Sequence, residues 1–276
     1  MNLGPTVNTS APDHCPSVSA DGLSLFFESK RAGGAGSADV WVTTRDTKDD
    51  PWGAPMNLGP TVNGPSGDAC PSISSDGLSL FFRADGFGRK DLWVTTRAKS
   101  DDDWGPAVNL GATVNTAPFT DGGPSISTDG LMLFFHSDRP GGYGDSDLYV
   151  TMRATTSDPW STPVNLGPTI NSSSHDGAPS ISDDGSTLFF GSKRPGGLGS
   201  GDLWQVSIEP IVDLNSDGIV DSADICIIID HWSTDESLCD VAPMPWGDGI
   251  VDVKDLVLLA EHLTIKEDDP NEPILP

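Results

Sequence analysis

The chain repeats itself four times, and this repetition constrains the fold more than any other feature of its 276 residues. The tripeptide Asn-Leu-Gly recurs at spacings of 55, 52 and 56 residues, beginning at Asn2, Asn57, Asn109 and Asn165. Internal repeats of this length are typical of architectures in which one supersecondary unit packs on the next. The chain must therefore place four similar units side by side.

Each copy carries the signals of four short strands. An Asp-Gly pair lies between two strand-like runs, which is the signal of a tight β-hairpin. A glycine-rich loop then leads to a third strand, and we expect a fourth strand from a tryptophan to the next Asn-Leu-Gly. The Asp-Gly pairs begin at Asp21, Asp76, Asp129 and Asp184, and the tryptophans are Trp52, Trp104 and Trp160. Four strands per repeat predict the blades of an all-β fold, a β-propeller.

The two ends of the repeat region match each other. The chain opens with Met1-Asn2-Leu3-Gly4, the tail of a fourth strand, and the last repeat stops after its third strand, at residues 202–207. The first residues can therefore complete the fourth blade and close a four-bladed ring. The alternative is part of a larger ring, because the start lacks the tryptophan of the fourth strand. Four blades is also the low end of the usual range.

The repeat pattern P-S-[IV]-S-x-D-G-x-x-L-F-F covers residues 13–207 in four copies together with the loop that follows it. It resembles the TolB-type, WD-like propeller repeats of secreted and envelope bacterial proteins. The second copy departs from the pattern, because its loop, RADGFGRKD, is shorter and lacks the Gly-Gly pair. The resemblance implies a propeller that serves as a protein-interaction platform or a ligand-binding module, and occasionally as part of an enzyme.

The charge is strongly negative and unevenly spread. The formal net charge is −26, with 15 Lys and Arg against 41 Asp and Glu. Residues 1–211 contribute −12 and residues 212–276 contribute −14. Such a balance argues against nucleic-acid or anionic-membrane binding, and no apolar stretch is long enough for a membrane span. The break in composition predicts a propeller over residues 1–209 (repeats of about 2–56, 57–108, 109–164 and 165–209), a second domain over 210–265 and an acidic tail over 266–276.

The second domain begins with a calcium-binding pattern, DLNSDGIVDSAD. Oxygen ligands at positions 1, 3, 5, 7, 9 and 12 with a glycine at position 6 wrap one Ca²⁺ in an EF-hand loop. Position 12 is Asp here instead of the usual Glu. The expected ligands are Asp213, Asn215, Asp217, the Ile219 carbonyl, Asp221 and Asp224. An apolar stripe at helical spacing follows: Ile225, Ile228, Ile229 and Trp232.

A second, weaker copy of the loop follows. Its positions 1 and 3 are Met244 and Trp246, so we expect Asp240 to supply the first ligand from an expanded loop. The remaining ligands of the second copy are Asp248, the Ile250 carbonyl, Asp252 and Asp255, and its helical stripe is Leu256, Leu259, Ala260 and Leu263. The alternative is that this second site is weak or empty.

Two such half-motifs in tandem resemble a type I dockerin, which residues 213–264 cover almost completely. Dockerins attach enzymes and binding modules to cohesin-bearing scaffolds for polysaccharide breakdown. In that family, loop positions 10 and 11 help to choose the cohesin. Here these positions differ between the copies, which puts symmetric two-way docking in doubt and leaves docking onto the chain's own propeller open. The positions are Ser222 and Ala223 in the first copy and Val253 and Lys254 in the second.

Four cysteines form two suggestive pairs. Cys15 and Cys70 hold the same position in successive repeats, where the third and fourth repeats have Gly123 and Ala178. Cys226 and Cys239 could clip the first helix of the second domain to its second loop. An even count in an exported, calcium-folded protein favours disulfides over buried free thiols, although no signal peptide is visible at the start of the chain.

A recurring carboxylate precedes the first strand of each repeat and would circle one mouth of the propeller channel. It could form a cation site or a sugar-binding rim, although capping of its own loop is the simpler interpretation. Residues specific to one repeat near this mouth are more informative. The candidate ligand rim comprises Asp13, His14, Asp68, Phe119, Asp121, His175 and Asp176, with Tyr143 in one glycine-rich loop. A second recurring set, Asp39, Asp91, Asp147 and Asp202, is expected to pair with the loop arginines Arg31, Arg139 and Arg194.

These features predict a secreted bacterial propeller that acts as a non-catalytic binding or scaffold module in extracellular polysaccharide use, with a dockerin that binds Ca²⁺ and a cohesin-like partner. No familiar catalytic motif stands in a credible context. The first alternative is a glycoside hydrolase or polysaccharide lyase with its site at the channel mouth. The second is a platform that binds only proteins.

Overall fold

The structure is a computed structural model of the whole chain, and it describes residues 2–86, 89–208, 214, 222–233, 250–251 and 256. The chain divides into two compact units, Met1–Ser207 and Ile208–Pro276. The first unit is the repeat region, and its end lies two residues before the boundary that the composition predicts. Each unit is described by itself below.

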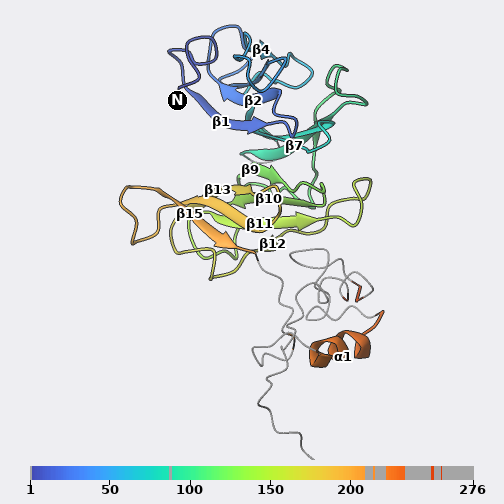
Figure 1. The fold of residues 1–276 in the computed structure, drawn as a ribbon. Helices are drawn as coiled ribbons and strands as arrows, with labels where there is room; N and C mark the ends of the chain where they lie inside the picture. The colour runs from blue at the N-terminus through green and yellow to red at the C-terminus, as the bar shows by residue number, and fades with distance from the viewer. Residues whose placement is uncertain are drawn as a thin grey trace, which may run out of the picture. The chain divides into compact units, whose positions relative to one another are not determined.

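The first unit is an all-β propeller of four blades, as the repeats predict (Figure 1). The innermost strands are β1 (Asp13–Val18), β5 (Ala69–Ile73), β9 (Asp121–Ile126) and β13 (Asp176–Ile181). The second strands are β2 (Ser24–Ser29), β6 (Ser79–Ala84), β10 (Met132–Ser137) and β14 (Thr187–Ser192). The third are β3 (Asp39–Thr44), β7 (Asp91–Thr96), β11 (Asp147–Met152) and β15 (Asp202–Ser207). The outer strands are β4 (Met56–Asn57), β8 (Val108–Asn109) and β12 (Val164–Asn165). All neighbouring strands within a blade are antiparallel.

The Asp-Gly pairs form the predicted hairpin turns. Gly22 has a φ of +73°, which a residue with a side chain rarely adopts. The Asp21 carboxylate accepts hydrogen bonds from Ser19 Oγ at 2.5 Å and from the Leu23 amide at 2.9 Å, and the same bonds recur at Asp76 and Asp129. The turn therefore fixes the register of β1 on β2 and of its equivalents.

A β-bulge interrupts the innermost strand of every blade. In β1 the pairing shifts between His14 and Ser17, and Cys15 has a φ of +49°. Cys70, Gly123 and Ala178 occupy the same place with φ of 51°, 60° and 51°. A bulge re-aims side chains locally, and here it brings Cys15 beside its equivalent in the next blade.

The apolar core lies between the blades. The paired phenylalanines point to opposite faces, because neighbouring residues of a strand alternate. Phe26 packs with Leu80 and Phe82 of the next blade, and Phe81 packs in the same way with Leu133 and Phe135. Trp104 and Trp160 cover these contacts, with ring centroids 6.0 Å from Phe26 and Phe81. These tryptophans precede the outer strands, which have two residues each, so the predicted fourth strand is longer than the observed one.

The four blades form an open arc in the described part of the chain. Each innermost strand lies beside the next, in the order β1, β5, β9, β13, but the described strands of the first and fourth blades are not in contact. The fourth blade has only three described strands. The expectation that the chain's own first residues close the ring is therefore wrong for this structure, because Asn2–Gly4 does not pair with β15.

In the second unit the structure describes one helix, α1 (Ser222–Asp230), where the sequence predicts a helix after the first loop. Ile228 is buried, with Val251 and Leu256 packed against it, and the Ser233 amide donates to the Val251 carbonyl at 2.8 Å. The predicted stripe is only partly right, because Ile229 and Trp232 are exposed. The buried side of α1 therefore packs against Val251 and Leu256.

Candidate functional site

The four innermost strands line a central hollow of about 360 Å³. Each contributes the same four positions around its Pro-Ser pair, and the fourth blade adds Asp183. The lining segments are Cys15–Val18, Cys70–Ile73, 123–126 and 178–181. The repeat thus builds a binding-sized concavity from small side chains and backbone.

Three of the four carboxylates predicted to circle the channel mouth form ion pairs with arginines of their own blades. Arg139 Nη2 donates to Asp121 Oδ1 at 2.6 Å and to the Val114 carbonyl at 2.7 Å, and Arg139 Nε donates to Ser137 Oγ at 2.9 Å. The guanidinium carbon lies 5.2 and 4.9 Å from the ring centroids of Phe135 and Tyr149. The same ion pair joins Arg31 to Asp13 at 2.7 Å and Arg194 to Asp176 at 2.8 Å.

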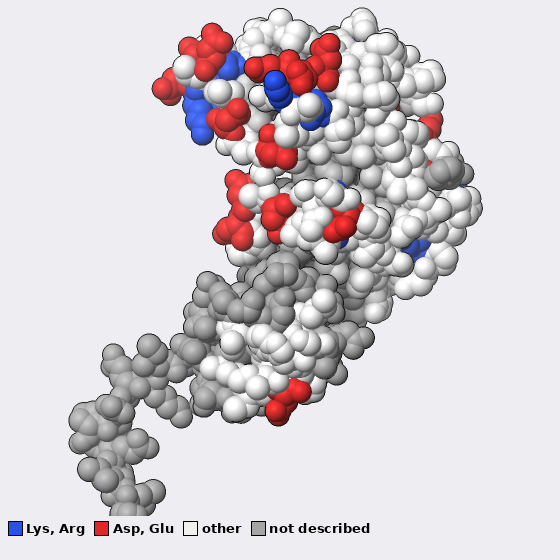
Figure 2. All heavy atoms as spheres, turned by 90° about the vertical axis from the view of Figure 1, so that its right-hand side faces the viewer, with Lys and Arg blue, Asp and Glu red and all other residues white. Residues whose placement is uncertain are grey.

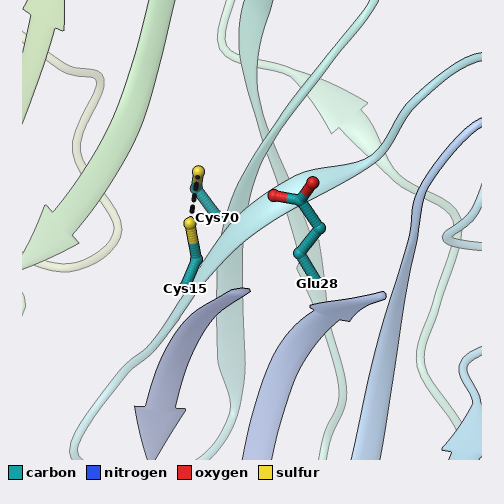
Figure 3. A group of neighbouring side chains, drawn as sticks. All are labelled: Cys15, Glu28 and Cys70. Carbon is teal, nitrogen blue, oxygen red and sulfur yellow. Dashed lines mark hydrogen bonds between the residues drawn. The ribbon is translucent and has the colours of Figure 1, made fainter. Parts of the chain in front are cut away.

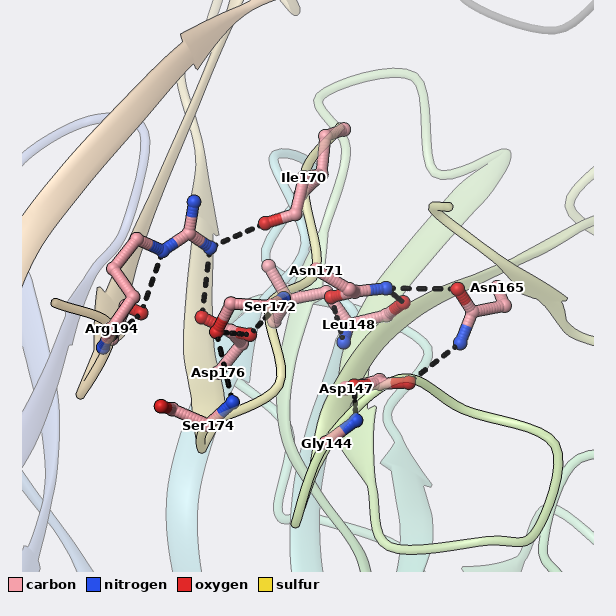
Figure 4. Close-up of polar contacts among 11 residues, drawn as sticks. Gly144, Asp147, Leu148, Asn165, Ile170, Asn171, Ser172, Ser174, Asp176 and Arg194 are labelled. Carbon is pink, nitrogen blue, oxygen red and sulfur yellow. Dashed lines mark hydrogen bonds and ion pairs between the residues drawn. The ribbon is translucent and has the colours of Figure 1, made fainter. Parts of the chain in front are cut away.

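This arrangement corrects the predicted pairing of the loop arginines. They bind the aspartates that begin the innermost strands, whereas the second recurring set caps the glycine-rich loops. Asp147 accepts from the Tyr143 and Gly144 amides at 2.5 and 3.1 Å and from Asn165 Nδ2 at 3.0 Å (Figure 4). Close to the carboxylate the loop needs glycine, because a Cβ on Gly142 would lie 2.0 Å from Asp147 Oδ2.

An asparagine then joins each blade to the next. Asn171 Oδ1 accepts from the Leu148 amide at 2.7 Å, and Asn171 Nδ2 donates to the Leu148 carbonyl at 3.0 Å and to Asn165 Oδ1 at 2.9 Å (Figure 4). Asn63 and Asn115 make the same bonds to Val40 and Leu92. These recurring polar side chains are structural, since each satisfies buried backbone groups across a blade junction.

Asp68 breaks this symmetry. The shorter loop of the second blade places Ala84 and Gly86 where the others have a serine and an arginine, and no described arginine reaches Asp68. The Asp68 side chain is only 3% exposed and accepts from the Gly64 amide at 2.7 Å. Burial raises the pKa of Asp68 to about 6, and Asp39 adds to the rise while Lys90 opposes it. Asp68 is therefore a buried acid without the counter-charge of its equivalents.

Two cysteines and a glutamate meet at the junction of the first two blades (Figure 3). The Sγ atoms of Cys15 and Cys70 are 2.9 Å apart, and both residues are free cysteines in this structure. One ligand atom of each residue and of Glu28 lie within 4.8 Å of one another. The hydrogen bond between the thiols lowers the pKa of Cys70 and raises that of Cys15. The predicted neighbourhood of the two cysteines is present, and the disulfide stays a prediction.

Sequence reasoning missed one position of the second strand, directly after the phenylalanine pair. The first three blades have Glu28, Arg83 and His136 there. Arg83 Nε is buried without a hydrogen-bond partner in the described structure. His136 Nδ1 accepts from the Ala178 amide at 3.3 Å, and its ring lies 6.0 Å from that of His175. Burial lowers the pKa of His136 to about 3, with Arg83 adding to the effect, so the ring is neutral. The available signal was that the charge of the residue at this position differs from repeat to repeat, while the neighbouring positions stay nearly the same.

The remaining predicted rim residues do not converge on the hollow. His14 and Tyr143 are exposed, Phe119 and His175 are half-buried, and none of the seven predicted rim residues lines the hollow. The Phe119 carbonyl accepts from the Arg89 amide at 3.4 Å, so its backbone belongs to a blade junction. In the structure, Asp13, Asp121 and Asp176 thus form ion pairs with arginines, and the Pro-Ser segments line the hollow.

Most predicted residues of the second domain lie outside the described residues. These are nine of the eleven calcium ligands, the candidate cohesin contacts Val253 and Lys254, and Cys239. The other two ligands are Asp224, which lies in α1, and Ile250. Ser222 and Ala223 begin α1, and Cys226 is an exposed free cysteine on the same helix.

On the side of the molecule that Figure 2 shows, acidic side chains form several separate groups on the described residues, and basic side chains lie among the upper ones. Among the described helices, none has the length and apolar character that crossing a membrane requires.

The fold defines a β-propeller, and comparison with solved structures makes it TolB-like. TolB from Acinetobacter baumannii matches at a TM-score of 0.50 and 16% identity, over 74% of this chain and 43% of that one. A TolB from Agrobacterium tumefaciens matches at 0.49 and 18%, over 74% and 61%. An α-L-arabinofuranosidase from Lactobacillus brevis matches at 0.49 and 13%, over 73% and 74%. The chain spans less than two thirds of the two TolB structures.

No family model and no curated protein matches the sequence. The structural likeness to the Acinetobacter TolB therefore shows the fold of the repeat region alone.

Proposed function

We propose that the protein is a secreted, non-catalytic binding propeller whose C-terminal domain is a calcium-binding dockerin, attached through it to an extracellular system that degrades polysaccharides. The observation that carries the binding role is the central hollow, which four copies of one Pro-Ser segment line. Three of the four aspartates that precede these segments are engaged in ion pairs with arginines. These ion pairs stabilise the blades. The hollow provides a concave surface and hydrogen-bonding groups for a ligand.

The calcium role rests on the sequence of the second domain. The first loop supplies carboxylate and carbonyl oxygens at EF-hand spacing, which is the donor set that Ca²⁺ prefers. Calcium removal with a chelator should unfold this domain, because binding free energy of such small modules is folding free energy. Asp217→Ala should abolish binding at the first site, and Asp252→Ala should affect the second site only. Calorimetric titration with Ca²⁺ counts the sites.

One observation favours the enzyme alternative. A catalytic acid needs an environment that differs from that of its neighbours, and the pKa of Asp68 is raised whereas those of the equivalent Asp13 and Asp176 are lowered. A glycoside hydrolase or lyase would require substrate to reach this carboxylate, which is 3% exposed. We therefore place the enzyme second.

The deciding experiment is a glycan-array screen of the full chain in Ca²⁺, with bound glycans checked for cleavage. Binding without cleavage supports the proposed function and names the ligand. Cleavage that Asp68→Asn abolishes would establish the enzyme instead. No binding to any plant, algal or bacterial glycan would contradict both the glycan-binding module and the glycan-cleaving enzyme. The protein-binding platform would then be the remaining function.

A matched pair of variants locates the site. Pro16→Trp places an indole in the hollow and should abolish glycan binding, since Pro16 is exposed and lines it. Val108→Trp adds the same indole to an exposed outer strand and should leave binding unchanged.

A further inference from the structure

Glu28 is a buried acid without a partner in the described part of the chain. It is 8% exposed, and its side chain makes no hydrogen bond or ion pair with any described residue. Other buried acids of the propeller have such partners, since Asp39 accepts from the Ala35 amide and Asp121 pairs with Arg139. A buried carboxylate is normally paired, hydrogen-bonded or bound to a metal ion. Glu28 therefore lacks the compensation that its position requires.

The groups that face Glu28 are the thiols of Cys15 and Cys70. One carboxylate oxygen and the two sulfurs lie within 4.8 Å of one another, and Figure 3 shows the carboxylate turned toward the sulfurs. Cys15 comes from β1, Glu28 from β2 and Cys70 from β5, so two blades assemble the group. Among the described residues, no other three side chains of this kind are close enough to share a metal ion.

We propose that Cys15, Cys70 and Glu28 bind one Zn²⁺ ion. Two thiolates and a carboxylate belong to the donors that Zn²⁺ takes, whereas Ca²⁺ and Mg²⁺ prefer oxygen ligands alone. Cu(I) also accepts two thiolates, but this soft ion has no use for the carboxylate. Binding forms two Zn–S bonds and one Zn–O bond, and each thiol releases its proton to solvent as its bond forms. This zinc site goes beyond the proposed glycan binding and does not depend on it.

The sulfurs need only a small movement to admit the ion. They are 2.9 Å apart, and two Zn–S bonds of about 2.3 Å at a tetrahedral angle would place them about 3.8 Å apart. Rotation of the two cysteine side chains about their Cα–Cβ bonds supplies such a separation. The Glu28 carboxylate is already beside both sulfurs, so the three ligands require no rearrangement of the strands.

Arg83 provides a counter-charge for the loaded site. Zn²⁺ bound by two thiolates and one carboxylate carries one net negative charge. The Arg83 guanidinium is close enough to act electrostatically on both sulfurs. Its Nε is buried without a hydrogen-bond partner in the described structure. The zinc site therefore places a negative charge beside a buried cation, which lowers the cost of burying both.

The fourth coordination position of the ion faces the central hollow. Tetrahedral Zn²⁺ with three protein ligands keeps one position open for water or another donor. Cys15 and Cys70 both line the hollow. A molecule bound in the hollow could therefore coordinate the ion directly through an oxygen or nitrogen atom.

A zinc titration of the full chain tests the site. The protein is kept reduced with a phosphine, and excess Ca²⁺ occupies the oxygen ligands of the acidic second domain. In competition with a chromophoric chelator, we expect one Zn²⁺ per chain and none in Cys70→Ser. Glu28→Gln should weaken binding by about tenfold or more, because even residues that only support a ligand contribute about 10–100-fold to metal affinity. Cys226→Ser removes an exposed thiol on α1 and should leave the affinity unchanged.

The cobalt-substituted protein identifies the ligands. Thiolates bound to Co²⁺ give a charge-transfer band in the near ultraviolet, and tetrahedral Co²⁺ gives strong visible bands. We expect both in the wild-type protein and neither in Cys15→Ser or Cys70→Ser. Thiocyanate should shift the visible bands by taking the open position. Far-ultraviolet circular dichroism of the metal-free variants establishes that each is folded, so that a lost band reports a lost ligand.

Zn²⁺ should also protect the two thiols from oxidation. Oxidised glutathione takes two electrons and two protons from the cysteine pair, which forms the disulfide, and is reduced to two molecules of glutathione. Coordinated thiolates are withheld from this reaction. At a Zn²⁺ concentration that saturates only the wild-type protein, we expect slower loss of thiols in the wild type than in Glu28→Gln.

Three results would overturn the inference. If the reduced wild-type protein takes up no stoichiometric Zn²⁺, the site does not exist. Equal affinities of the wild type and Glu28→Gln would mean that the carboxylate is not a ligand. A cobalt spectrum that thiocyanate leaves unchanged would contradict the open position toward the hollow.

Discussion

In the third blade, Arg139 Nη2 lies 2.6 Å from Asp121 Oδ1, whereas Asp68, the equivalent acid of the second blade, has no described arginine beside it. The difference arises from the shorter second loop, which omits the arginine altogether. Three blades therefore hold an acid paired with an arginine, and one holds a buried acid whose charge opposes folding. This contrast allows the same substitution to be tested in two environments.

Arg139→Gln should destabilise the propeller by about 3–5 kcal/mol, because it leaves the fully buried Asp121 carboxylate without its counter-charge. Urea unfolding followed by tryptophan fluorescence measures the change. Arg89→Gln is the control, since Arg89 is exposed and its nitrogen is 3.8 Å from Asp138, and it should cost less than about 1 kcal/mol. Equal losses for the two variants would show that the Arg139 pair is not structural.

Asp68→Asn should stabilise the protein at neutral pH. Because the pKa of Asp68 rises from 3.8 to about 6 on folding, the folded state holds an extra proton between these values. Stability from this residue therefore falls as the pH rises through that window and is lowest above it. Asp68→Asn should raise the free energy of unfolding at pH 7.5 by about 1–3 kcal/mol, with a smaller gain at pH 4.5.

The matched variant is Asp121→Asn, which should lower the free energy of unfolding at pH 7.5 because Arg139 loses its carboxylate. Urea denaturation of both variants at the two pH values decides the matter. The same sign of effect for Asp68→Asn and Asp121→Asn would refute the assignment of Asp68 as the uncompensated acid.

Asn115→Ala should destabilise the junction between the second and third blades by about 2–4 kcal/mol. The substitution removes three hydrogen bonds of a buried side chain and takes away the acceptor of the Leu92 amide, while the Leu92 carbonyl keeps its bond from the Leu110 amide. Hydrogen exchange should show the loss of protection at the Leu92 amide. Thr113→Ala, at an exposed position two residues earlier, is the control and should leave that amide protected.

Oxidation should join Cys15 to Cys70. The sulfurs need to approach from 2.9 Å to the bond length of about 2.05 Å, and closure of a loop of this length contributes about 4 kcal/mol. Thiol counting by mass spectrometry should show the loss of two thiols under mild oxidant and a higher melting temperature. The Cys70→Ala variant should show neither effect. Two free thiols in the oxidised wild-type protein would leave the pair as a hydrogen-bonded dithiol.

The local units of this protein can be predicted from the order of its amino acids alone. The repeat of Asn-Leu-Gly and Asp-Gly predicted four blades, because turn residues and alternating apolar residues act over a few positions and are visible in any one copy. The same reasoning located Cys15 beside Cys70, since equivalent positions of neighbouring blades lie close together. It also predicted a helix where α1 lies, from the apolar spacing after the first calcium loop.

The pairing of the polar side chains and the end of the arc, in contrast, became visible only in the packed molecule. Arg139 could pair with either of two recurring aspartates, and the choice of Asp121 over Asp147 depends on the aromatic faces of Phe135 and Tyr149, which come together only in the packed blade. The uncompensated charge of Asp68 follows from the same pairing. The sequence shows that the second loop lacks the arginine, but only the structure shows that this arginine would have paired with Asp68. Whether residues 2–8 reach β15 depends on the angle between successive blades, a long-range property that no local pattern encodes.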